Sequence, residues 1–84
     1  MPKLKIDALG KVQVLSIANC FYPTVHIRCL DAKTKKCRLG GPVGEILSQY
    51  KIPNNWIMKR LEVQAAGIYG TVDIYFEIDD RLPA

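Results

Sequence analysis

The chain has 84 residues, of which 49% are hydrophobic, and a formal net charge of +4. This length predicts a single domain over residues 1–84, and the hydrophobic content excludes a disordered chain. No apolar run approaches the ~20 residues that span a bilayer, and Met1–Asp7 lacks the apolar block of a secretion signal, so we expect a cytoplasmic protein without a membrane partner.

The first segments in chain order are predicted to be strands. Residues 1–10 are expected to form an arm or, through Leu4–Ile6, an edge strand. In Lys11–Ala18 the apolar residues change phase after Val14, which is typical of a bulged strand or of a strand covered on both faces. Thr24–Leu30 alternates regularly and is predicted to pair with it as a first hairpin, across a turn over residues 19–23.

The middle of the chain is predicted to hold a basic loop and a helix. Asp31–Arg38 is polar, and we expect an exposed loop or a short edge strand there. Pro42 suits the first turn of a helix, and Pro53 stops it near Lys51. An apolar stripe at helical spacing supports this helix: Val43, Ile46, Leu47 and Tyr50.

The end of the chain predicts a second hairpin, formed by Ile57–Ala66 and Thr71–Ile78 with a turn over residues 67–70. Alternation puts Val72, Ile74, Phe76 and Ile78 on one face of the last strand. A four-residue loop would place Leu61 opposite Phe76, Val63 opposite Ile74 and Arg60 opposite Glu77. Residues 79–84 are expected to form a loose tail.

The predicted fold class is therefore α+β, in the order β-β-α-β-β. One helix would cover one face of a mainly antiparallel sheet of four strands, or five if Leu4–Ile6 adds an edge strand. Homodimerisation along an edge of so small a sheet is compatible with this arrangement.

The sequence gives no catalytic, metal or cofactor assignment. Four potential zinc ligands occur, but they lack a C-x₂-C knuckle, and His26 and Cys29 alternate onto opposite faces of one strand. Free thiols that pack as apolar residues are the preferred interpretation, and no nucleophile with a paired base is apparent, so we expect a protein that is not an enzyme. The four residues are Cys20, His26, Cys29 and Cys37.

A phosphate-binding interpretation rests on Gly41–Gly44 together with the basic segment before it. The G-x-x-G pattern resembles the clamp loop of KH domains, where it joins two helices; here no helical pattern precedes it. The interpretation without a ligand is a glycine-rich helix start beside a solvated basic loop, and it is preferred.

The remaining surface residues point to a binding role. Aromatic residues at the two predicted hairpin tips either fold back on the domain or anchor a partner: Phe21, Tyr22 and Tyr69. A run of cations follows the second strand: Lys33, Lys35, Lys36 and Arg38. The sheet face away from the helix is predicted to expose a mixed set that suits a protein partner: His26, Arg28, Arg60 and Tyr75.

The leading hypothesis is a small non-enzymatic protein that docks on a larger protein or nucleoprotein complex. An accessory or inhibitory factor of the mobile-element or phage type would have this size and this lack of catalytic motifs. The alternative is a nucleic-acid-binding module that uses Lys33–Arg38 and the helix start at Gly41–Gly44.

Overall fold

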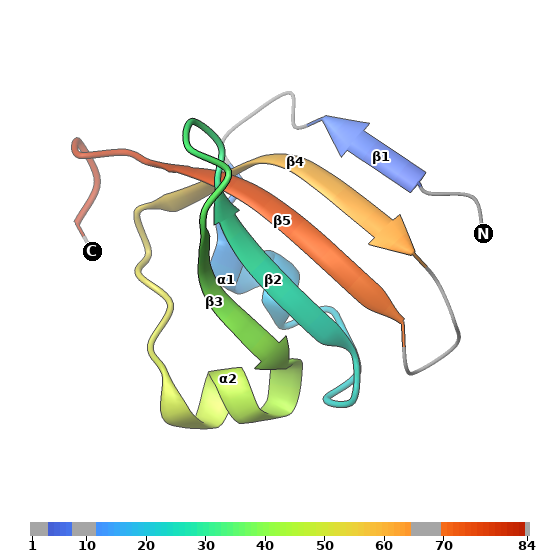
Figure 1. The fold of residues 1–84 in the computed structure, drawn as a ribbon. Coiled ribbons are helices and arrows are strands. Elements are labelled where there is room, and N and C mark those ends of the chain that lie inside the picture. Colours follow the sequence, from blue (N-terminus) through green and yellow to red (C-terminus); the bar gives the residue numbers. More distant parts are fainter. Residues whose placement is uncertain (1–3, 8–11, 65–69, 84) are drawn as a thin grey trace.

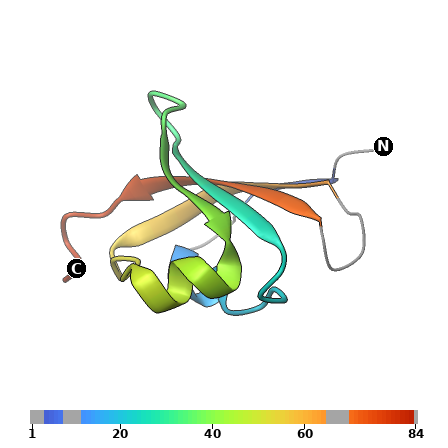
Figure 2. The same ribbon diagram turned by 60° about the horizontal axis from the view of Figure 1, so that its bottom comes forward.

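A computed structural model describes residues 4–7, 12–64 and 70–83. Its elements run β1 (Leu4–Asp7), α1 (Val14–Ala18), β2 (His26–Asp31), β3 (Cys37–Pro42), α2 (Val43–Gln49), β4 (Trp56–Gln64) and β5 (Thr71–Ile78). Strands β2 to β5 form a mixed sheet, and β1 adds a fifth strand at its edge, in the order β1-β4-β5-β2-β3 (Figure 1). Both helices lie on one face, so the α+β class is confirmed (Figure 2).

The predicted strand over Lys11–Ala18 is wrong, because Val14–Ala18 forms helix α1. The phase change that suggested a bulge is the first turn of this helix, which buries Val14 and Ala18, four positions apart, against the sheet. The side chain of Asn19 closes the helix by donating to the carbonyl of Leu15 at 2.9 Å.

The first predicted hairpin is therefore also wrong. Three of the four strand pairings in the sheet are antiparallel, as predicted, and one is parallel. Strand β2 pairs in parallel with β5, from His26 opposite Thr71 to Asp31 opposite Phe76, and antiparallel with β3. The observed order is β-α-β-β-α-β-β, with two helices where one was predicted. Helix α2 occupies the predicted position and buries Val43 and Ile46, but Tyr50, predicted on the same apolar stripe, follows the helix and is 54% exposed.

The closing hairpin is confirmed as β4 and β5, but its register differs by two residues from the prediction. Leu61 lies opposite Ile74 and Val63 opposite Val72, and Gln64 opposite Thr71 is the last pair. A shift of two residues keeps Leu61, Val63 and their partners on the predicted face, and Ile74 and Phe76 are fully buried as expected. Ile78, predicted on the same face, is 45% exposed.

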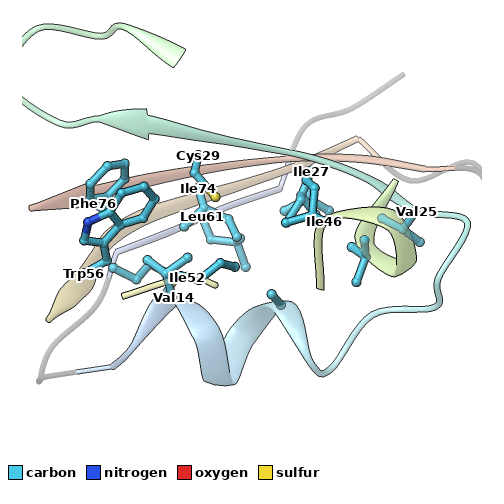
Figure 3. Close-up of a cluster of buried hydrophobic side chains, with 14 residues drawn as sticks. Val14, Val25, Ile27, Cys29, Ile46, Ile52, Trp56, Leu61, Ile74 and Phe76 are labelled. Atoms are coloured by element: carbon cyan, nitrogen blue, oxygen red, sulfur yellow. The ribbon is translucent and has the colours of Figure 1, made fainter. Parts of the chain in front are cut away.

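The core lies between the sheet and the two helices (Figure 3). Trp56 stacks on Phe76 with 4.0 Å between ring centroids and 14° between ring planes. Helix α1 contributes Val14, helix α2 contributes Ile46, and Ile52 fills the space after α2. Two aromatic rings bury about 150–250 Å² each, so this stack is a large part of the apolar surface that stabilises the domain.

Candidate functional site: the basic turn and the open sheet face

The predicted basic segment, Asp31–Arg38, divides into two parts. Residues 31–36 form a hydrogen-bonded turn between β2 and β3, here called the basic turn, and Arg38 is exposed on the edge strand β3. The carboxylate of Asp31 accepts from the amides of Lys33 at 2.8 Å and Thr34 at 3.3 Å, and its carbonyl accepts from the amide of Lys35 at 2.8 Å. Lys35 lies in the left-handed region, with φ 63°. The amide of Lys33 donates to the Asp31 carboxylate and lowers the pKa of that group. The backbone of the turn is therefore defined by its own sequence.

The basic turn projects from the sheet on the side opposite the helices (Figure 2). The amide of Ala32 donates to the carbonyl of Phe76 at 2.9 Å, which attaches the turn to β5. The ammonium of Lys35 lies 4.8 Å from the ring centroid of Tyr75, a cation–π contact. The turn thus stands beside the open face of the sheet, with one of its cations directed onto that face.

A β-bulge in β4 brings two further cations to the same place. Met58 lies opposite Phe76 and Arg60 opposite Tyr75, so Lys59 is the extra residue between them. Lys59 and Arg60 are consecutive and both exposed, whereas Met58, which strict alternation with Arg60 would place on the open face, is buried in the core. Sequence analysis missed Lys59; the signal was the adjacent pair of charges interrupting an alternating strand.

Together these elements line a hollow of about 200 Å³ on the open face. The basic turn supplies one cation, the bulge supplies two, and the ring of Tyr75 forms part of the wall. We call it the cationic hollow, and its residues are Ala32, Lys35, Lys59, Arg60 and Tyr75. Converging cations beside an aromatic ring favour an anionic group over a neutral one.

The rest of the open face is electrically mixed. The guanidinium of Arg28 donates to both carboxylate oxygens of Asp73, at 2.8 and 2.7 Å, and the pKa of Arg28 is raised chiefly by this hydrogen bonding. The ammonium of Lys59 lies 3.9 Å from the carboxylate of Glu77. His26 is exposed on the same face, opposite Thr71. Of the predicted open-face residues, Arg28 thus has its charge offset by a carboxylate.

The predicted aromatic residues lie at the other end of β2. Phe21 is half-buried against the core, and Tyr22 is 67% exposed. Both line a mainly apolar hollow of about 200 Å³ with Val63 and Val72. Strand β2 has six residues, which at about 3.3 Å each separates this hollow from the basic turn by about 20 Å. The described residues of the predicted set therefore divide into two separate surfaces. Tyr69 lies outside the described residues.

The helix start at Gly41–Gly44 is also distant from the basic turn, at the other end of β3. The amide of Val43 donates to the carbonyl of Val25 at 2.9 Å, and the amide of Gly44 donates to the carbonyl of Pro23 at 3.0 Å. These two amides are used within the chain, and Pro42 has none, so the loop presents little to a phosphate.

Within residues 4–7, 12–64 and 70–83, no three His, Cys, Asp or Glu side chains gather where they could hold a metal ion. Cys20 and Cys37 are exposed thiols, and Cys29 is buried, which raises the pKa of its thiol to about 12. No helix in the described part of the chain is long and apolar enough to cross a membrane.

Comparisons of the chain with protein-family models, with curated proteins and with solved structures gave no match. The geometry of the basic turn and the cationic hollow therefore carries the functional argument.

Proposed function

We propose that this protein is a small non-enzymatic binding protein that docks on a larger protein or nucleoprotein complex through the basic turn and the open face beside it. The observation that supports this most is the hydrogen bonding of Asp31, which orders a projecting turn with Lys33, Lys35 and Lys36 on it. An ordered loop loses little conformational entropy on binding, and exposed cations steer an acidic partner toward it. A role as an accessory or inhibitory factor suits a docking protein of this size.

The test is affinity capture from host lysate with and without nuclease, comparing the wild type with Lys33→Gln/Lys36→Gln. Both lysines are exposed, so the variant should fold, and its amide spectrum checks this. Lys51→Gln is the control, because Lys51 is an exposed lysine beyond α2, outside the turn. We expect to capture a protein partner whether or not nuclease is added. Lys51→Gln should still capture this partner, and the double variant should not. Capture that is equal for all three proteins would contradict docking through the turn.

A second candidate function is direct binding of single-stranded nucleic acid, favoured by the ring of Tyr75 beside the cations of the hollow. It predicts an oligonucleotide affinity that falls steeply with salt concentration, because phosphate contacts release counterions. Fluorescence anisotropy with labelled DNA and RNA oligonucleotides at low and moderate salt measures this. Absence of binding at low salt would exclude this candidate.

A further inference from the structure

We propose that the cationic hollow receives one carboxylate side chain from an acidic segment of a protein partner. This inference rests on the proposed function, since it names the chemistry of the contact beside the basic turn. The partner is identified only by charge: it presents a glutamate or aspartate that inserts between the turn and the bulge of β4.

The first argument is that the cations converge on one place. Lys35 reaches it from the turn, where its ammonium lies over the ring of Tyr75. Lys59 and Arg60 reach it from β4, because the bulge exposes two consecutive residues. Two ordered backbone features, the turn and the bulge, set this convergence, and an anion placed there accepts charge-assisted hydrogen bonds.

The second argument concerns the size and lining of the hollow. Its volume of about 200 Å³ accommodates one side chain. Ala32 and the ring of Tyr75 provide apolar surface against which the methylene groups of a glutamate can pack, while its carboxylate faces the cations.

The third argument favours a carboxylate over a nucleic-acid strand. A strand carries a phosphate on every nucleotide, so it needs a continuous path of cations. Here the neighbouring positions of β5 are Asp73 and Glu77, paired with Arg28 at 2.7 Å and Lys59 at 3.9 Å. These carboxylates would repel the neighbouring phosphates of a strand, whereas a single acidic side chain needs no cations beyond those of the hollow.

The ion pair between Lys59 and Glu77 is weak enough for a ligand to replace it. Lys59 and Glu77 are about half exposed, and their contact of 3.9 Å is at the limit of an ion pair. Such a contact is weak, so the ammonium of Lys59 can leave Glu77 for a carboxylate in the hollow.

The test is an NMR titration of the ¹⁵N-labelled protein with a short glutamate-rich peptide and, separately, with oligothymidylate of equal charge at the same ionic strength. The expected result is saturable peptide binding that shifts the amides of Ala32, Lys59 and Tyr75. Lys59→Gln should raise the peptide Kd about tenfold, as expected for one lost charge-assisted hydrogen bond. Lys51→Gln removes the same charge far from the hollow and should change the Kd less than about twofold.

Equal effects of Lys59→Gln and Lys51→Gln would overturn the proposal, since binding would then follow net charge alone. Tighter binding of oligothymidylate at the same amides would overturn it in favour of nucleic acid. If Lys36→Gln weakens peptide binding and Lys59→Gln does not, docking through the turn stands and the hollow is not its receptor. If the turn variants leave partner capture unchanged, the proposed function itself fails.

Discussion

Arg28 and Asp73 are directly opposite each other on the parallel strands β2 and β5, and their side chains form a two-hydrogen-bond ion pair at 2.8 and 2.7 Å. The two residues are 45 positions apart in the chain. The pair joins the halves of the sheet on its open face, where Arg28 is 59% exposed and Asp73 13% exposed.

We expect a double-mutant cycle with Arg28→Ala and Asp73→Ala to give a coupling free energy of about 0.5–1 kcal/mol. The two parallel hydrogen bonds place this coupling free energy near the upper end of the range for surface ion pairs, and the exposure of Arg28 to solvent limits it. Urea unfolding measures the cycle, and its repeat in 1 M salt should reduce the coupling because salt screens exposed charges. A coupling free energy of zero at low salt would show that the ion pair does not contribute to the free energy of unfolding.

Three glycines around the start of α2 should respond differently to replacement by alanine. Gly41 has φ +142°, which a side chain disfavours, and a Cβ on Gly44 would lie 2.8 Å from the Cβ of Pro23. We expect Gly41→Ala and Gly44→Ala each to lower the free energy of unfolding by about 1–3 kcal/mol, the clash at Gly44 exceeding the gain of about 1 kcal/mol in helix propensity.

Gly40→Ala is the matched control for these two variants. A Cβ there would meet the sulfur of Cys37 at 3.6 Å and Arg28 at 3.8 Å, which are ordinary contacts. Its free energy of unfolding, measured with urea, should stay within about 0.5 kcal/mol of the wild type. A loss at Gly40 equal to that at Gly44 would contradict the observed approach of α2 to Pro23.

Two of the three cysteine thiols should react with an alkylating reagent in the folded protein, and the third should be protected from it. Cys20 and Cys37 are exposed, whereas Cys29 is buried and the pKa of its thiol is raised to about 12. Because the thiolate is the reactive form, iodoacetamide at pH 8 should label the first two in the native protein and Cys29 only after unfolding. Mass spectrometry of tryptic peptides measures this. Native labelling of Cys29 at the rate of Cys20 would contradict its burial.

Burial of Cys29 also predicts a loss of stability at alkaline pH. In the unfolded chain the thiol ionises near pH 8.5–9, whereas in the folded protein it stays protonated up to about pH 12. Its contribution to stability is therefore complete below about pH 8.5 and is lost as pH rises toward 12, by up to about 1.4 kcal/mol per pH unit. Urea unfolding of wild type and Cys29→Ala from pH 7 to 10 should show a steeper decline for the wild type. An equal decline of the free energy of unfolding with pH in both proteins would contradict this role of Cys29.

The alternation in Thr71–Ile78 predicted its buried face, and Val72, Ile74 and Phe76 are buried. The register of the same hairpin could not be predicted this way. A period of two is unchanged by a shift of two residues, so pairing Leu61 with Phe76 or with Ile74 satisfies the pattern equally.

The segment that became α1 shows a different limit. An apolar stretch as short as Val14–Ala18 fits both the strand and the helix period. Packing decided between them, since the helical form completely buries both Val14 and Ala18 beneath the sheet.

The candidate site was found only in part. The sequence identified the cations of the basic turn, Lys33, Lys35 and Lys36, because they lie within four positions of one another in the chain. Lys59 joins them only through the bulge opposite Phe76, and Tyr75 only through the fold of the turn onto β5.

Local pattern alone thus determined the inward face of β5, the apolar stripe of α2 and the position of the basic turn, because each depends on neighbours within a few residues. Tertiary structure alone decided that β2 pairs in parallel with β5, that β4 and β5 lie between β1 and β2 in the sheet, and that three cations meet at one hollow. These features join residues that are distant in the chain. They form because this arrangement buries apolar surface between the sheet and both helices.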